Sequence, residues 1–276
     1  LRRAVAVEPN APDARLALAN ALLASSQTAP ASIGEALQHL DRGMRSAPAD
    51  VAMRSQRAWA LYLLGRHDEA AAEWEAILVA EPAYAPSLLN LGQLHAKAGR
   101  HAVALDYYRR GMAVPRDSAF SGSFEGSYRA TWLLKQAASA KAAGNMDEAV
   151  AALYQAIVLA PNDAEPRFQY GNTMLGLKRF DEAVAQLEAA DLLLPGKPKH
   201  LAALGYGLAQ SGRLEEAEER LVAATTGAPR YALAWFHLGN VKVQRGDRDG
   251  ARACFERAIE VRPDFRAARE ALDKVR

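Results

Sequence analysis

The stretch that decides the fold is residues 232–265, ALAWFHLGNVKVQRGDRDGARACFERAIEVRPDF. Apolar residues recur at helical spacing before and after Gly246, so we expect a helix on each side of that glycine. Pro263 closes the second helix, because proline cannot continue it. The same pattern returns along the chain with a period of 34 residues. A fixed period of this length indicates a repeat architecture, since one such unit cannot bury its apolar face without a neighbour.

Two positions of the repeat hold a small residue in every copy. In the first helix of each unit, helix A, they are Ala19, Ala58, Gly92, Ala137, Gly171, Gly205 and Gly239. In the second helix, helix B, they are Ala36, Ala70, Ala104, Ala149, Ala183, Ala217 and Ala251. Small residues are expected where helix A crosses helix B, because a large side chain would hold the two axes apart. A bulky residue follows on helix B to fill the next gap: Leu40, Trp74, Tyr108, Leu153, Leu187, Leu221 and Phe255.

In this register the residues resemble the tetratricopeptide repeat, with its pattern Trp-x2-Leu-Gly-x2-Tyr, then Ala-x3-Phe, then Pro. The best single match is Trp235, Leu238, Gly239, Ala251, Phe255, Ala258 and Pro263. The resemblance covers nearly the whole chain. It implies an all-α fold, a right-handed α-solenoid of stacked antiparallel helix pairs. Complete repeats are expected to start at Pro12, Val51, Ala85, Ala130, Ala164, Pro198 and Ala232.

The register also divides the chain. We expect helix B of a truncated repeat at 1–11, three repeats at 12–118, an insertion at 119–129, four repeats at 130–265 and a capping helix at 266–276. Arg57 and Gln136 stand where leucine is usual, and Gln136 lies close to the insertion, so the stack is expected to bend there. Within the insertion, Phe120, Phe124 and Tyr128 are four residues apart. They would form one stripe if the segment extends the next helix, and we expect this stripe to pack on the neighbouring repeats; the alternative is that it meets a partner.

The turns between helices A and B carry two signals. Helix A is expected to end at a glycine that tolerates a left-handed backbone, namely Gly65, Gly99, Gly144, Gly212 or Gly246. Lys178 replaces this glycine in the fifth repeat. Helix B then begins with an aspartate whose carboxylate is expected to cap free amide groups, namely Asp68, Asp147, Asp181 or Asp249.

Composition and charge argue against several classes of function. The formal net charge is +2, with 34 basic and 32 acidic residues, so there is no electrostatic reason to expect nucleic acid as a partner. No apolar run is long enough for direct membrane insertion. The single cysteine, Cys254, precludes an internal disulfide and is expected to pack in the core beside Phe255.

Nothing in the sequence indicates catalysis or a cofactor. The histidines are scattered over different repeats without metal-ligand spacing: His39, His67, His95, His101, His200 and His237. None of them recurs with a serine and a carboxylate as in a triad. Each glycine already has a place at a helix end or a helix crossing, so no phosphate loop is expected. We therefore expect a protein that is not an enzyme, with no metal site and no cofactor.

A second stripe on helix A is left over for function. Repeat positions 4, 7, 8 and 11 face the core, which leaves positions 2, 5, 9 and 12 as a stripe at helical spacing. In the tetratricopeptide family this stripe lines the concave groove that holds ligands. Its candidate partner-binding residues here are Asn20, Trp59, Tyr62, Gln93, Phe168, Asn172, Tyr206, Phe236 and Asn240. Exposed aromatic surface of this kind usually marks a contact site; the alternative is that some of these side chains pack between neighbouring helices.

Two known variants of the family's groove are absent. The carboxylate clamp of chaperone adaptors would need Lys and Asn where Ser55 and Trp59 stand, and the asparagine ladder of O-GlcNAc transferases is interrupted at most positions, for example by Lys135. Two functions remain open. One is a non-catalytic scaffold or adaptor that binds a peptide or helix of a partner protein. The other is the recruiting region of a larger enzyme, of the sulfotransferase or glycosyltransferase type.

Source, compartment and assembly are less constrained. The Ala-, Arg- and Gly-rich composition favours a bacterial source. The chain starts at Leu1 in what reads as the second half of a repeat, so a preceding segment is expected, and the sequence assigns no compartment. A cytoplasmic location is slightly favoured over a periplasmic one. Self-association through the solenoid ends is left open.

Overall fold

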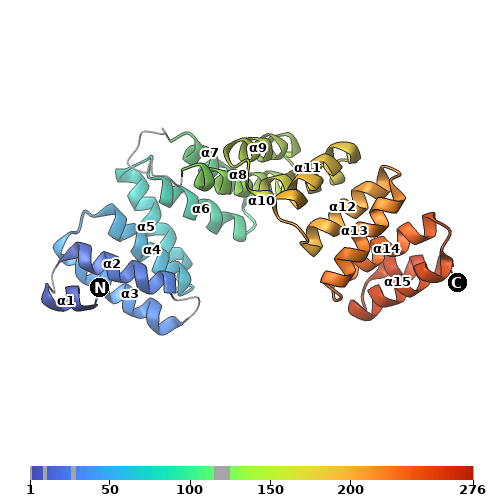
Figure 1. The fold of residues 1–276 in the computed structure, drawn as a ribbon. Helices are drawn as coiled ribbons and strands as arrows, with labels where there is room; N and C mark the ends of the chain where they lie inside the picture. Colours follow the sequence, from blue (N-terminus) through green and yellow to red (C-terminus); the bar gives the residue numbers. More distant parts are fainter. Residues whose placement is uncertain (1, 9–10, 26–28, 115–124, 276) are drawn as a thin grey trace. The chain divides into compact units, whose positions relative to one another are not determined.

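The computed structural model describes residues 2–8, 11–25, 29–114 and 125–275, and within these residues every regular element is an α-helix (Figure 1). The helices are α1 (Arg2–Val7), α2 (Pro12–Ser25), α3 (Pro30–Ser46), α4 (Val51–Leu63), α5 (His67–Ala80), α6 (Ala85–Lys97), α7 (His101–Met112), α8 (Glu125–Ala142), α9 (Met146–Leu159), α10 (Ala164–Gly176), α11 (Phe180–Leu193), α12 (Pro198–Gln210), α13 (Leu214–Gly227), α14 (Ala232–Gln244), α15 (Arg248–Val261) and α16 (Arg266–Val275). The prediction of an all-α fold is confirmed.

The chain forms two compact units, residues 1–149 and 150–276, with the division inside α9. In the first unit α2 pairs with α3, α4 with α5 and α6 with α7, and each pair packs on the next. In the second unit α10 pairs with α11, α12 with α13 and α14 with α15, and α16 covers α15. Each unit is thus a stack of helical hairpins.

Helix α8 differs from the predicted register at its start. The other A helices begin where the register places a repeat, but α8 begins at Glu125 rather than Ala130. The end of the insertion therefore extends this helix. Phe120 and Phe124, two members of the predicted apolar stripe, lie outside the described residues. The predicted bend at the insertion stays a prediction.

The small residues lie at the helix crossings, as predicted. The seven alanines of helix B and the small residues of helix A are all buried. A Cβ atom added to Gly171 would lie 2.6 Å from Leu187 Cγ, and one added to Gly205 would lie 2.6 Å from Leu221 Cγ. The bulky residue of helix B therefore occupies the space that the missing side chain leaves. This packing explains why helix A keeps a small residue at this position in every repeat.

The turns after helix A use a left-handed residue. Glycine supplies it in most repeats, for example Gly65 with φ 79° and Gly246 with φ 83°. In the fifth repeat Lys178 adopts φ 60°, and it is the only residue other than glycine with a positive φ among the described residues. The prediction that helix A ends in this conformation is therefore confirmed, and the fifth repeat keeps the turn with a residue that is strained in it.

The predicted aspartate caps of helix B are wrong for α5 and α11. The residue at the N-cap is an arginine, and no side chain caps either helix. The aspartates Asp68 and Asp181 lie two residues after the N-cap, in the first turn, where they still face the positive end of the helix dipole. The N-cap arginine instead pairs with a glutamate three residues later, as Arg66 does with Glu69 at 2.7 Å. In α15 the prediction of Asp249 is also wrong, because the cap is Asp247, which accepts a hydrogen bond from the amide of Gly250 at 2.8 Å.

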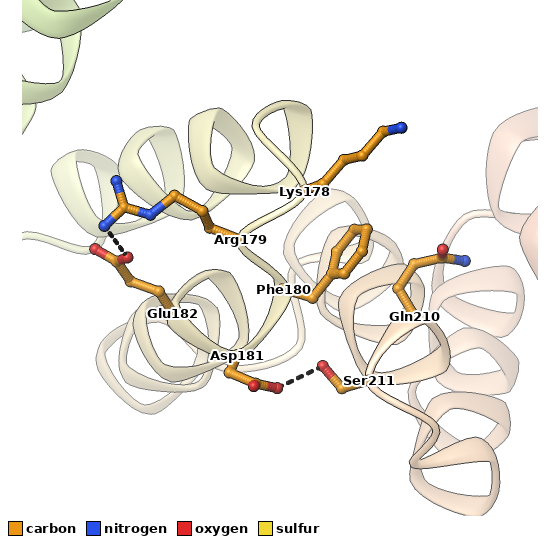
Figure 2. Close-up of a pocket in the computed structure, with 7 residues that line it drawn as sticks. All are labelled: Lys178, Arg179, Phe180, Asp181, Glu182, Gln210 and Ser211. Carbon is orange, nitrogen blue, oxygen red and sulfur yellow. Dashed lines mark hydrogen bonds and ion pairs between the residues drawn. The ribbon is translucent and has the colours of Figure 1, made fainter.

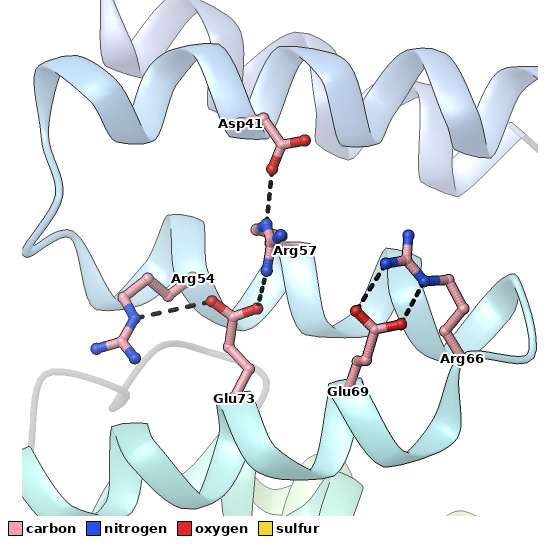
Figure 3. A network of polar contacts seen from close by, with 6 residues as sticks. All are labelled: Asp41, Arg54, Arg57, Arg66, Glu69 and Glu73. Atoms are coloured by element: carbon pink, nitrogen blue, oxygen red, sulfur yellow. Dashed lines mark hydrogen bonds and ion pairs between the residues drawn. The ribbon is translucent and has the colours of Figure 1, made fainter.

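Polar residues at the usual leucine position bridge neighbouring B helices. Arg57 on α4 donates from Nε to Asp41 on α3 at 2.6 Å and from Nη1 to Glu73 on α5 at 2.5 Å (Figure 3). Gln136 on α8 likewise donates to Glu148 at 2.9 Å, and Glu148 also accepts from Arg109 on α7. These residues replace an apolar contact by hydrogen bonds that satisfy both partners. The polar positions are therefore structural, and they lie away from the predicted groove.

Candidate partner-binding faces

A groove on the second unit collects three of the predicted residues. It has a volume of about 400 Å³, and its walls come from the A helices α10, α12 and α14. The predicted residues in it are Phe168, Asn172 and Tyr206, which come from two successive repeats and are each half-buried. The other lining residues are Leu175, Lys199, Ala202, Ala203, Tyr231, Leu233 and His237. The groove therefore combines apolar walls with an amide and one exposed ammonium group.

Two histidines hold the aromatic rings of this groove in place. The ring of Phe168 stacks on His200 with centroids 4.1 Å apart, and Tyr206 stacks on His237 at 4.7 Å. Burial lowers the pKa of His237 to about 4, and burial also lowers the pKa of His200. Both imidazoles are thus neutral at pH 7. Neutral rings can stack against the aromatic side chains without the cost of burying a charge.

Phe236 has a different environment from the other predicted aromatics. Its ring lies 5.1 Å from Phe265 and 6.0 Å from Phe255, so it packs into the cluster that holds α16. Asn240, one turn further along α14, is half-buried. Phe236 therefore matches the alternative left open from the sequence, in which a stripe residue packs between neighbouring helices.

A second face lies on the first unit. Trp59 and Tyr62 on α4 stack with centroids 5.2 Å apart, and both are half-buried. Lys97, the last residue of α6, donates a hydrogen bond to the hydroxyl of Tyr62 and lies 5.0 Å from the centre of its ring. Gln93, one turn earlier on α6, lines a pocket of about 200 Å³ together with Lys97 and Lys135. Trp59, Tyr62 and Gln93 are therefore linked through Lys97.

Asn20 stands apart from both faces. It is exposed on α2, two hairpins away from Gln93 on α6, and it lines neither the groove nor the pocket. Leu89 also belongs to the stripe, at position 5 of the repeat that starts at Ala85, but it is buried in the core of the first unit. The stripe is therefore a mixture of packing residues and surface residues, and only the packing of neighbouring repeats distinguishes them.

The predicted partner-binding stripe did not include the basic and imidazole groups of these two faces. Lys135 and His237 occupy position 6 of their repeats, directly beside position 5 of the stripe. Lys97 directly follows position 12, the last stripe position of its repeat. Lys199 and Tyr231 also line the groove of the second unit. Position 6 could have indicated Lys135 and His237, because residues at positions 6 and 9 are neighbours on the surface of a helix.

A third hollow, of about 490 Å³, lies at the turn between α10 and α11 (Figure 2). Arg179 pairs there with Glu182 at 2.5 Å, and Ser211 donates to Asp181 at 2.9 Å. Most of its charged groups are thus satisfied by one another. This hollow is a weaker candidate for partner binding than the aromatic groove.

The described residues contain no arrangement that suggests catalysis. No group of three His, Cys, Asp or Glu side chains in this part of the chain could hold a metal ion. Cys254 is buried, and burial raises the pKa of its thiol to about 11, so it is not a nucleophile at pH 7. No described helix is long and apolar enough to cross a membrane.

Comparison with known families accounts for this architecture. Two family models described as tetratricopeptide repeat match the chain, one at residues 140–205 and 208–275 and the other at 31–86 and 56–113. Together these matches cover more than half of the chain. The chain belongs to the tetratricopeptide repeat family. The family's fold is consistent with a protein–protein interaction scaffold.

Solved structures of other tetratricopeptide repeat proteins share the fold. YrrB, described as a TPR protein with an unusual peptide-binding site, is 20% identical with a TM-score of 0.59, and the alignment covers 74% of this chain and 99% of that one. The Cut9–Hcn1 hetero-tetramer of the APC/C gives a TM-score of 0.63 at 13% identity, over 96% of this chain and 53% of that one. At these identities the likeness shows the tetratricopeptide repeat fold alone.

One curated relative is an enzyme. Protein O-mannosyl-transferase TMTC1 of Mus musculus is 35% identical over 71 residues, which are 26% of this chain and 8% of the relative. The similar region thus spans a small part of that protein's length.

Proposed function

We propose that this tetratricopeptide repeat protein is a non-catalytic scaffold or adaptor that binds a peptide or helix of a partner protein on its A-helix faces. The observation that carries the proposal is the groove of the second unit, which is lined by the half-buried residues Phe168, Asn172 and Tyr206. Aromatic anchors beside a hydrogen-bonding amide are typical of peptide recognition. The peptide-binding site named for YrrB, which has the same fold, is consistent with this proposal.

The groove suits an extended or helical segment better than a small molecule. It is open along the A helices and is lined by residues of three successive repeats, so a ligand can contact α10, α12 and α14 together. The half-buried rings are held by the histidine stacks rather than free to rotate, and a pre-organised surface loses less conformational entropy on binding.

A second candidate function is the recruiting region of a larger enzyme. The similarity to part of a mouse O-mannosyl-transferase favours it, since that enzyme contains a segment like this one. In this alternative the groove presents a substrate protein to a catalytic domain elsewhere in the same polypeptide. The full-length gene distinguishes the two, because only the enzyme would encode a catalytic domain beside the repeats.

The experiment selects ligands from a random peptide library on the immobilised protein and measures their affinity for groove variants. Phe168→Ala and Tyr206→Ala should each weaken the selected peptides at least about tenfold. The matched control is Tyr154→Ala, which removes an aromatic ring that is 61% exposed on α9, outside the groove. Circular dichroism checks that every variant stays helical. Loss of binding in the control with normal binding in both groove variants would refute the proposal.

A further inference from the structure

The pocket of the first unit is basic and contains no acidic group. It lies where α6, α7 and α8 meet, and its lining residues are Gln93, Ala96, Lys97, His101, Tyr108, Lys135, Ala138 and Ser139. Two lysines from neighbouring A helices therefore share a hollow of about 200 Å³. Like charges this close repel one another unless an anion lies between them.

Among the described residues, Lys135 has no counter-ion. Its side chain is half-buried, and it makes no hydrogen bond or ion pair with any other described residue. Burial and the charge of Lys97 both lower the pKa of Lys135. Lys242 of the second unit shows the contrast, because it pairs with Glu218 at 3.1 Å and with Asp247 at 2.8 Å. A partly buried ammonium group without a partner is disfavoured, and an anion that enters the pocket would relieve this cost.

The other polar groups of the pocket are suited to the same ligand. Among the described residues His101 Nδ1 is buried without a hydrogen-bond partner, and Gln93, which carries an amide, also lines the pocket. Lys97 is oriented by its hydrogen bond to Tyr62, which stacks on Trp59. The basic pocket is therefore continuous with an aromatic platform. A peptide whose apolar side chain lies on the platform can place a neighbouring acidic group in the pocket.

We propose that the pocket formed by Gln93, Lys97, His101 and Lys135 binds a carboxylate group of the partner segment. The proposal rests on the scaffold function argued above and specifies the chemistry of its ligand. The two ammonium groups donate to the carboxylate oxygens, and such charge-assisted hydrogen bonds are about twice as strong as neutral ones. The carboxylate belongs either to a Glu or Asp side chain or to the C-terminus of the partner.

The test compares four pools of synthetic random dodecamer peptides by fluorescence polarisation with the full chain. Two pools carry Glu at fixed positions and two carry Gln there, and each kind is made with a free or an amidated C-terminus. We expect at least one carboxylate-bearing pool to bind at least about tenfold tighter than the neutral amidated pool. Loss of the preference on Glu→Gln assigns the site to a side chain, and loss on amidation assigns it to the terminus.

Substitutions at Lys135 connect the preference to the pocket. Lys135→Met should abolish the preference for carboxylate-bearing peptides, whereas Lys135→Arg should retain it. The control Lys274→Met removes an exposed lysine of α16 and should change nothing. In the free protein Lys135→Met should also raise the melting temperature, since it removes an unpaired half-buried charge.

The possible failures are distinguishable. If the neutral pool binds but the carboxylate-bearing pools show no advantage, or if Lys135→Met retains the advantage, the carboxylate pocket is wrong and the scaffold function stands. If no pool binds at any concentration, both proposals fail.

Discussion

Gly111 on α7 and Trp132 on α8 fit together so closely that no side chain can be added to the glycine. A Cβ atom at Gly111 would overlap the six-membered part of the Trp132 indole, whose Cε3 atom would lie only 2.5 Å away. Trp132 is buried, so it has little room to move. The same relationship joins Gly43 to Met53, whose Sδ atom would lie 2.6 Å from an added Cβ. At this position a glycine in the last turn of helix B makes room for a large side chain of the next helix A.

The first prediction concerns this contact. Gly111→Ala should destabilise the first unit by about 1–3 kcal/mol, because the new methyl group forces a buried ring out of place. Thermal unfolding followed by circular dichroism measures the change. The matched control is Gly34→Ala on α3, where an added Cβ meets no atom within 4 Å. That change should leave stability equal or slightly higher, since alanine is the better helix former. A loss in the control similar to that in Gly111→Ala would contradict the packing explanation.

The second prediction concerns the strained turn of the fifth repeat. Lys178→Gly should raise the stability of the second unit by about 1 kcal/mol, because glycine adopts φ 60° without steric cost. The reciprocal change, Gly212→Lys, places lysine at the equivalent turn with φ 79° and should lower stability by a similar amount. Melting temperatures of both variants test the pair. Equal temperatures for the wild type and both variants would show that the turn carries no strain.

The third prediction concerns the bridge between B helices in Figure 3. Arg57→Leu restores the leucine usual in the family, yet it should destabilise by about 1–3 kcal/mol, because Glu73 loses its partner at 2.5 Å and keeps only Arg54 at 3.9 Å. Glu73 is only 11% exposed, so water cannot replace the arginine fully. The double variant Arg57→Leu with Glu73→Leu should recover most of the loss. Urea unfolding of the single and double variants measures this coupling.

An exposed pair in the same region serves as the control for the bridge. Arg66→Leu breaks the contact with Glu69, which lies at the protein surface. Surface ion pairs contribute little to stability, so this variant should behave like the wild type. If Arg66→Leu destabilises as much as Arg57→Leu, burial is not what makes the bridge important.

The fourth prediction concerns pH. Because the pKa of His237 falls from 6.5 to about 4 on folding, the unfolded chain binds the proton first as the pH is lowered. The contribution of this residue to stability is therefore complete above pH 6.5 and decreases between pH 6.5 and 4, by about 3 kcal/mol in total. His237→Phe keeps a ring against Tyr206 and should flatten that part of the curve. Melting temperatures from pH 7.5 to 4.5 test it, and an unchanged slope in the variant would contradict the assignment.

The helix pairs could be predicted because their signals are local and repeated. Ala183 and Leu187 lie one turn apart, and Gly171 meets them within a single repeat, so the period alone reveals the crossing. The start of α8 could not be placed in the same way. The register begins that repeat at Ala130, but the helix continues back to Glu125 into a segment that has no counterpart in the other repeats.

The candidate site was only partly predictable for a related reason. The stripe on helix A predicts which residues leave the core of their own repeat, but not which of them the next repeat covers. Phe168 and Phe236 occupy the same repeat position, yet Phe168 lines the groove while Phe236 packs on Phe265 of the following segment. Likewise, no pattern in the sequence pairs Lys97 with Lys135.

The amino-acid sequence by itself determined the helical hairpins, their register and the family, because each depends on the spacing of small and bulky residues within one 34-residue unit. Only the tertiary structure decided which surface residues meet. The Lys97 and Lys135 pocket and the Arg57 bridge both form between different hairpins. Their geometry follows from how one repeat packs on the next, and that packing is set by side-chain volumes such as those of Gly111 and Trp132.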